Sequence, residues 1–143
     1  MRRVALVVAM ALVLPGCGGD DEAVPTQPTT TQRAIVQCGG PAVKPDLPRD
    51  FPAVEGVTYT KSTSAGPSKI VDGYYEGRLE DAYRKFKTAL RAAGYAVIFD
   101  EIEAQDSEVA YSGGDLDRSG FVALREDCAQ PGRISVHITN RPA

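Results

Sequence analysis

Oxygen-bearing side chains recur at alternate positions in one segment, which makes it the first candidate for chemistry. Asp115, Asp117 and Ser119 are followed directly by Gly120 and, further along, by Glu126. Carboxylates and hydroxyls are the hard ligands that Ca²⁺ prefers, and a carboxylate at the end of such a run can bind through both of its oxygens. Asp115, Asp117, Ser119 and Glu126 are therefore candidate calcium ligands.

In residue types, the segment 115–126 resembles the calcium loop of EF-hand proteins, which is flanked by two helices. The flanking residues oppose that context, because Gly113-Gly114 would interrupt a helix before the loop and Pro131-Gly132 would shorten one after it. If 121–125 is a strand, Glu126 lies about 20 Å from Gly120, at about 3.3 Å per residue. We therefore expect a polar turn between two antiparallel strands. The alternatives are a weak calcium site formed by Asp115, Asp117 and Ser119 without Glu126, and a true EF-hand.

His137 is the only histidine of the chain, so it would have to be the base for any serine or cysteine nucleophile. Alternation in a strand over 134–139 places it with Ser135 and Thr139, opposite the apolar residues. The sequence also lacks a G-x-S-x-G turn, a phosphate-binding loop and a histidine cluster. We predict that the protein is not an enzyme, since an active site would need a pocket joining His137 to a carboxylate and a nucleophile.

The N-terminus carries an export pattern. Arg2 and Arg3 precede an uncharged run, Val4–Leu14, that ends just before Pro15-Gly16-Cys17. As a helix the run would be about 16 Å long, roughly half of a bilayer core, which is typical of a signal peptide and too short to span. Leu14-Pro15-Gly16-Cys17 resembles the lipobox of bacterial lipoproteins. The resemblance implies a diacylglyceryl thioether on Cys17 and removal of residues 1–16.

A lipidated Cys17 places the protein on the extracytoplasmic face of a bacterial membrane, held there by its acyl chains. Residues 17–33 contain almost no large apolar side chains, so we expect a disordered tether. The whole chain has a net charge of −3, and loss of Arg2 and Arg3 makes the mature part more acidic. This charge does not suit nucleic acid as a partner.

Two cysteines remain once Cys17 is assigned to lipid. Cys38 and Cys128 stand near the two ends of the segment 34–143, which fits one globular domain. Export places them in an oxidising compartment, and no CxxC motif or nearby histidine suggests a redox or metal role. We predict a disulfide between Cys38 and Cys128.

The domain is predicted to be α+β, a two-layer sandwich of one antiparallel sheet of about five strands with one helix packed on it. The helix is predicted from apolar residues spaced three and four apart over 78–93, and the strands from β-branched and alternating residues. The order is β-β-α-β-β-β, with strands at 57–63, 69–75, 95–103, 121–125 and 134–139, and a proline-rich coil, 39–56, along the edge of the domain. Several aromatic residues are expected in the core, with a ligand groove as the alternative: Phe51, Tyr59, Tyr74 and Tyr75.

The stretch 46–52, the helix ending in Ala-Gly-Tyr and the closing strands resemble the mature domains of small bacterial envelope lipoproteins of unassigned function. The resemblance implies the one-helix, one-sheet architecture and brings no active site with it. We expect a non-catalytic binding module that contacts another envelope protein and needs no cofactor. The alternatives are a calcium-binding protein acting through 115–126 and a small envelope enzyme.

Overall fold

The computed structural model describes residues 34–143, so the expected signal peptide 1–16, Cys17 and the tether 17–33 lie outside it. The described part contains one antiparallel sheet of six strands and one helix, which confirms the α+β class. The elements follow in chain order: β1 (Val57–Ala65), β2 (Ser68–Glu76), α1 (Leu79–Ala92), β3 (Tyr95–Ile102), β4 (Asp106–Gly113), β5 (Arg118–Arg125) and β6 (Arg133–Pro142).

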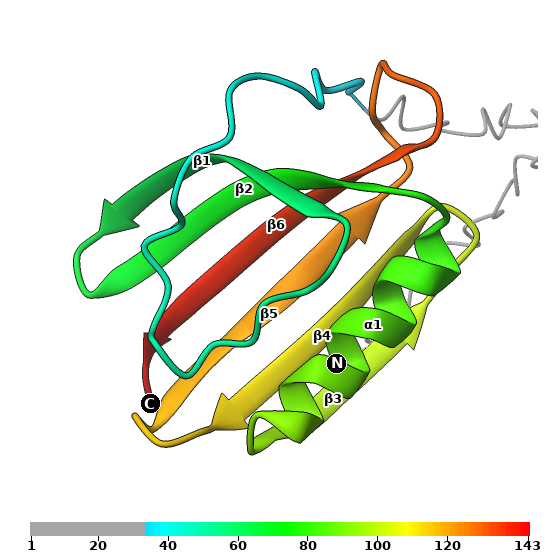
Figure 1. Cartoon of the computed structure of the whole chain (residues 1–143). Helices are drawn as coiled ribbons and strands as arrows, with labels where there is room; N and C mark the ends of the chain where they lie inside the picture. Colours follow the sequence, from blue (N-terminus) through cyan, green and yellow to red (C-terminus); the bar gives the residue numbers. More distant parts are fainter. Residues whose placement is uncertain (1–33) are drawn as a thin grey trace, which may run out of the picture. The chain divides into compact units, whose positions relative to one another are not determined.

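The strands lie in the order β1-β2-β6-β5-β4-β3 (Figure 1). After the hairpin β1-β2, helix α1 carries the chain across to the far edge, where β3 begins. The meander β3-β4-β5-β6 then returns, and β6 pairs with β2 in the middle of the sheet. Strands that are distant in sequence therefore meet at the centre, and β1 and β3 form the two edges.

The prediction of about five strands in the order β-β-α-β-β-β was wrong, because β4 is a sixth strand. Ser107, Val109 and Tyr111 alternate into the core, but Ser107 is polar and the strand also carries Asp106 and Glu108. The apolar alternation was therefore too weak to separate this strand from a charged turn. Pairing with β4 and β6 also extends β5 back to Arg118, before the predicted start of that strand.

Helix α1 forms because its apolar residues make one stripe. Leu79, Ala82, Phe86 and Leu90 are spaced three and four residues apart, and all four are buried. Acidic residues lie in the first turn and Arg91 lies in the last, which suits the helix dipole. The stripe packs on β3, β4 and β5 and so covers half of one sheet face.

A coil covers the other half of that face, beside α1 (Figure 1). Leu47, Phe51 and Val54 pack into the same core as the helix, and the Phe51 ring lies 5.7 Å from the ring of Tyr111, centroid to centroid. The predicted coil therefore lies across the sheet face as well as along the edge, where the Val43 amide donates to the Tyr59 carbonyl at 2.8 Å. Its non-repeating backbone needs other groups to hold it in place.

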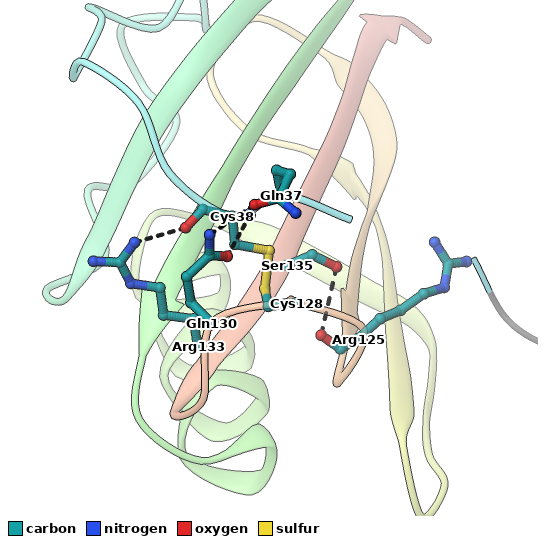
Figure 2. The surroundings of a disulfide bond; sticks show 7 residues. All are labelled: Gln37, Cys38, Arg125, Cys128, Gln130, Arg133 and Ser135. Atoms are coloured by element: carbon teal, nitrogen blue, oxygen red, sulfur yellow. Dashed lines mark hydrogen bonds between the residues drawn. A yellow bond between two sulfur atoms is a disulfide. The ribbon is translucent and has the colours of Figure 1, made fainter. Parts of the chain in front are cut away.

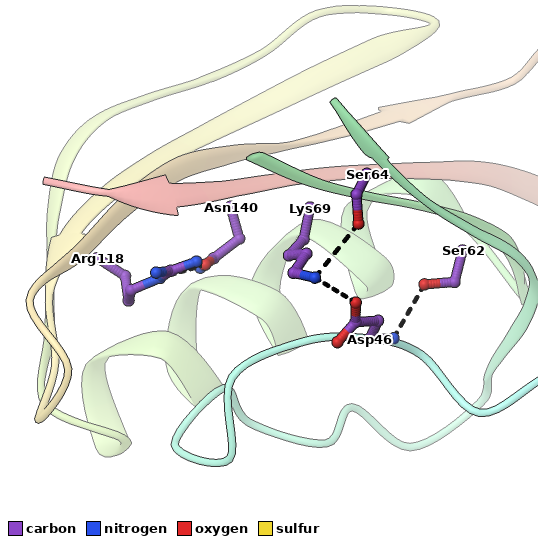
Figure 3. A network of polar contacts seen from close by, with 6 residues as sticks. All are labelled: Asp46, Ser62, Ser64, Lys69, Arg118 and Asn140. Atoms are coloured by element: carbon purple, nitrogen blue, oxygen red, sulfur yellow. Dashed lines mark hydrogen bonds and ion pairs between the residues drawn. The ribbon is translucent and has the colours of Figure 1, made fainter. Parts of the chain in front are cut away.

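Side chains supply that attachment (Figure 3). The Asp46 backbone amide donates to Ser62 Oγ at 2.9 Å, and its carboxylate accepts a hydrogen bond from Lys69 Nζ. Further along the coil, Asp50 Oδ2 accepts a hydrogen bond from the Leu116 amide at 3.2 Å. These contacts fix the coil to β1, to β2 and to the β4–β5 turn.

A buried polar residue, Asn140, lies on β6 opposite Gly120 of β5. Asn140 is fully buried; its Nδ2 donates to Tyr111 Oη at 2.9 Å, and its Oδ1 accepts from Arg118 Nε at 2.7 Å (Figure 3). The Tyr111 hydroxyl in turn donates to the Thr139 carbonyl at 2.8 Å, and burial raises the pKa of Tyr111. At Gly120 a β-carbon would come within 1.9 Å of that carbonyl oxygen, so only glycine fits there.

An ionic cluster fastens α1 to the edge strand β3. Asp100 accepts hydrogen bonds from Lys87 Nζ and from the Tyr83 hydroxyl, and Lys87 also donates to Tyr83 Oη at 3.2 Å. The hydrogen bond from Lys87 is the main cause that lowers the pKa of Asp100 below its usual value of 3.8. Because the folded pKa is depressed, the cluster stabilises the fold above pH 3.8 and loses this effect as the pH falls through the lower folded value.

We therefore expect Asp100→Asn to lower the melting temperature at neutral pH and this deficit to shrink as the pH falls below 3.8, because wild-type Asp100 then takes up a proton and loses its ionic contacts. Thermal unfolding followed by circular dichroism across that range checks this. Glu101→Gln is the matched control, because Glu101 contacts no cation within residues 34–143, and it should show no loss at neutral pH. A difference between wild type and Asp100→Asn that stays constant with pH would contradict the assignment.

Candidate binding surface on the open face of the sheet

The two faces of the sheet differ in what covers them. Along β6, Ile134, Val136 and Ile138 point into the core under α1 and the coil, and the residues between them point the other way. We call this second side the open face, because no helix among residues 34–143 packs on it. It presents these side chains from five strands: Ile70, Asp72, Phe99, Glu101, Glu108, Ala110, Phe121, Arg125, Ser135, His137 and Thr139.

One hollow of the open face is mainly apolar. It has a volume of about 450 Å³ and crosses the sheet from β2 to β3. Ile70, Ala110 and Phe121 form its floor, Ile98 stands on the β3 side, and Glu108 and other polar groups lie at its margin. We call this hollow the apolar cleft. Its lining combines apolar side chains with polar ones such as Glu108 and Arg141, a combination that is common in binding sites.

A second hollow, of about 330 Å³, contains the only histidine. His137 Nδ1 lies 2.7 Å from Asp72 Oδ1, the residue opposite it on β2. A carboxylate accepts hydrogen bonds, so Nδ1 is the donor in this contact. The Phe121 ring, 5.9 Å from the imidazole, adjoins the apolar cleft. We call this second hollow the histidine cleft.

The histidine cleft brings a base and a carboxylate together but does not align a nucleophile with them. Ser135 lies in the same cleft, yet its hydroxyl donates to the Arg125 carbonyl at 3.4 Å (Figure 2). Within residues 34–143 no hydroxyl or thiol hydrogen-bonds to His137. Acyl transfer needs the nucleophile to contact its base, so this arrangement is suited to polar recognition.

Cys38, which lines the histidine cleft, belongs to the disulfide drawn in Figure 2. Cys38 and Cys128 are bonded, with their Cα atoms 5.3 Å apart, so the predicted pairing is confirmed. Val36 adds a parallel bridge to Cys128, and Gln130 Oε1 accepts from the Cys38 amide at 2.9 Å. Closing a loop of 90 residues contributes about 4 to 5 kcal/mol in the chain-entropy model.

The same two cysteines and Asp127 are a close group of potential metal ligands within the described residues. Their ligand atoms lie within 4.8 Å of one another. Metal ligation by cysteine requires thiolate sulfur, and both sulfurs are committed to the disulfide. The oxidised protein therefore cannot use this group as a thiolate metal site.

The candidate calcium ligands are separated by the strand between them. Asp115 and Asp117 lie in the β4–β5 turn and Ser119 lies in β5, whereas Glu126 follows the other end of that strand. With the eight residues of β5 between them, Asp117 and Glu126 are nine residue steps and about 30 Å apart, at about 3.3 Å per residue. The predicted hairpin turn is present, with Gly113, Gly114 and Asp117 at positive φ, and the helices of an EF-hand are absent from this part of the described chain.

Sequence reasoning missed most residues of the open face. The apolar run Tyr95–Phe99 predicted a strand, which is present as part of β3, but it gave no sign that Ile98 is 64% exposed on an edge strand with a β-bulge between Val97 and Phe99. Asp72 gave no signal, since its pairing with His137 depends on the β2–β6 register. Two of the aromatic residues expected in the core are buried. Tyr75 belongs to the core, and Tyr74 lies under Arg133, whose guanidinium carbon is 4.1 Å from the centroid of the Tyr74 ring.

The chain matches no protein-family model, no curated protein and no solved structure. Among residues 34–143 no helix has the length and apolar character needed to cross a membrane. A function must therefore be argued from the geometry above and from the sequence.

We expect calcium at about millimolar concentration, where weak extracellular sites bind, to leave the melting temperature of the oxidised protein unchanged. The reason is that Glu126 cannot reach the turn. Thermal unfolding with and without calcium, on the wild type and on Asp115→Ala, measures this. A calcium-dependent rise that disappears in Asp115→Ala would restore the calcium hypothesis.

Proposed function

We propose that this protein is a lipid-anchored, extracytoplasmic binding module of a bacterial envelope, and that it binds another envelope protein through the open face of its sheet. The observation that carries the proposal is the asymmetry of the sheet. One face is covered by α1 and the coil, and the other presents two clefts and several apolar side chains.

The location is supported by the export pattern together with the disulfide. A buried cross-link between Cys38 and Cys128 is typical of a protein that folds in an oxidising compartment. The lipobox-like residues Leu14-Pro15-Gly16-Cys17 provide the attachment, and two acyl chains make a firm anchor where one would be marginal.

A non-catalytic role is favoured by the histidine cleft. Asp72 and His137 form an oriented pair, but Ser135 is hydrogen-bonded to the backbone instead of to the imidazole. The pair can instead recognise a partner, because it lies in a cleft that Ser135 and Arg125 also line, and His137 and Asp72 offer polar contacts there. Flat, partly apolar faces with polar margins are typical of protein–protein interfaces.

Anchoring is tested by metabolic labelling with radioactive palmitate. We expect the wild-type chain to be labelled and Cys17→Ser to be unlabelled, because only Cys17 occupies the lipobox position. The double variant Cys38→Ser/Cys128→Ser is the matched control and should keep its label. Labelled Cys17→Ser protein would exclude the proposed anchor.

Binding through the open face is tested by photo-crosslinking in cells of the bacterium that makes the protein. A photoreactive residue in place of Phe121 should give a discrete adduct with a second protein. The same residue in place of Thr88, which is exposed on α1 on the covered side of the sheet, should not. Equal adducts at the two positions, or none at either, would exclude the open face as the binding surface.

A further inference from the structure

The two edges of the sheet are not equivalent. At β1 the coil covers part of the edge, through the 2.8 Å hydrogen bond from the Val43 amide to the Tyr59 carbonyl. β3 pairs only with β4, and none of the residues 34–143 forms a ladder along its other side. The outer backbone groups of β3 are therefore available to an added strand.

Apolar side chains are concentrated at this edge. Ile98 is 64% exposed, Phe99 50% and Ile102 41%, which makes β3 the strand that exposes the most large apolar side chains in the described domain. The bulge between Val97 and Phe99 contributes to this exposure, and Ile98 borders the apolar cleft. Exposed apolar residues gathered on one edge mark a contact surface more often than isolated ones do.

Two carboxylates stand beside these residues without a compensating cation. Glu101 on β3 lies directly opposite Glu108 on β4, and both belong to the open face. Like charges in directly opposite positions destabilise a sheet. The neighbouring Asp100, on the covered face, is paired with Lys87, but neither Glu101 nor Glu108 contacts a lysine or arginine within residues 34–143.

We propose that β3 accepts an extended peptide segment of a partner protein as an additional strand, and that this segment carries an apolar residue and a lysine or arginine two positions apart. The proposal rests on the proposed function and specifies the partner's chemistry. Phe99 and Glu101 are themselves two positions apart on the open face. In an added strand the residues facing them have the same spacing, so one position is apolar and the other cationic.

The addition of a strand would make use of three features of the β3 edge at once. Backbone hydrogen bonds to β3 would supply affinity, as in other cases of strand addition. An apolar side chain opposite Phe99 would extend the apolar cleft outward, next to Ile98. A cation opposite Glu101 would lie close enough to offset the repulsion between Glu101 and Glu108.

The test uses the full chain, purified in a non-ionic detergent, and the fluorescein-labelled peptide Thr-Val-Thr-Lys-Thr-Val-Thr-Lys, read by fluorescence anisotropy. We expect saturable binding that weakens about ten-fold or more in Glu101→Lys/Glu108→Lys, since the peptide lysine would then face a like charge at position 101, with a second like charge behind it at position 108. The control Glu55→Lys/Glu80→Lys changes the net charge equally at two exposed positions away from β3 and should bind within about two-fold of wild type. Equal weakening in both double variants would overturn the proposal.

Peptides methylated on backbone nitrogens test strand addition on the wild-type protein, so this part of the test does not depend on a variant that folds. In an antiparallel addition only every second peptide amide faces β3. Methylation of the peptide amides that face β3 should abolish binding. Methylation of the amides that face away from β3 should leave binding nearly unchanged. Unchanged binding by both methylated peptides would exclude strand addition.

The outcomes separate this inference from the proposed function. No binding of the peptide by the wild-type chain, together with a crosslinked partner at Phe121, would overturn the strand-addition proposal and leave the open face as the binding surface. If the wild-type chain neither binds the peptide nor gives a crosslinked partner at Phe121, the strand-addition proposal and the proposed function are both overturned.

Discussion

The burial of one sheet face, half of it under helix α1 and half under the coil, is the constraint on which the described structure depends. Leu79, Phe86 and Leu90 of α1 pack against the inward side chains of β3, β4 and β5, all in one core. This burial is the main favourable term for the fold, and it uses the only helix among residues 34–143. Within residues 34–143 no helix packs on the opposite face.

The second half of the covered face shows how a coil can replace a helix. A coil has no internal ladder, so each part of it must be tied down by other groups. The disulfide holds one end at Cys38, Asp46 bonds to Lys69 and the Ser62 hydroxyl, and Asp50 accepts from the Leu116 amide. The proline-rich composition suits this role, because fixed φ angles reduce the entropy that ordering the coil costs. The disulfide therefore supports the covered face and, at the same time, shapes the histidine cleft on the open one.

Local patterns predicted the elements whose signal lies within a few residues. The spacing of Leu79, Ala82, Phe86 and Leu90 was sufficient for α1, and alternation in β6 placed His137 on the side away from the core. The β4–β5 turn followed from its glycines and aspartates. Strand β4 was missed because Ser107 occupies a core position and charged residues lie around it. The calcium pattern over 115–126 had the required residue types, but the intervening strand keeps those residues apart.

The sequence by itself determined the periodicities of the chain and was sufficient to predict the pairing of Cys38 with Cys128, while the export pattern of the N-terminus stays a prediction. Each of these depends on the type and spacing of residues alone. Only the tertiary structure decided that β6 lies between β2 and β5, that Asp72 meets His137, that Glu101 faces Glu108, and that β3 is an open edge. These are consequences of strand order and register, which are set by contacts between residues far apart in the chain, and a shift of one residue would have moved every one of those side chains to the other face.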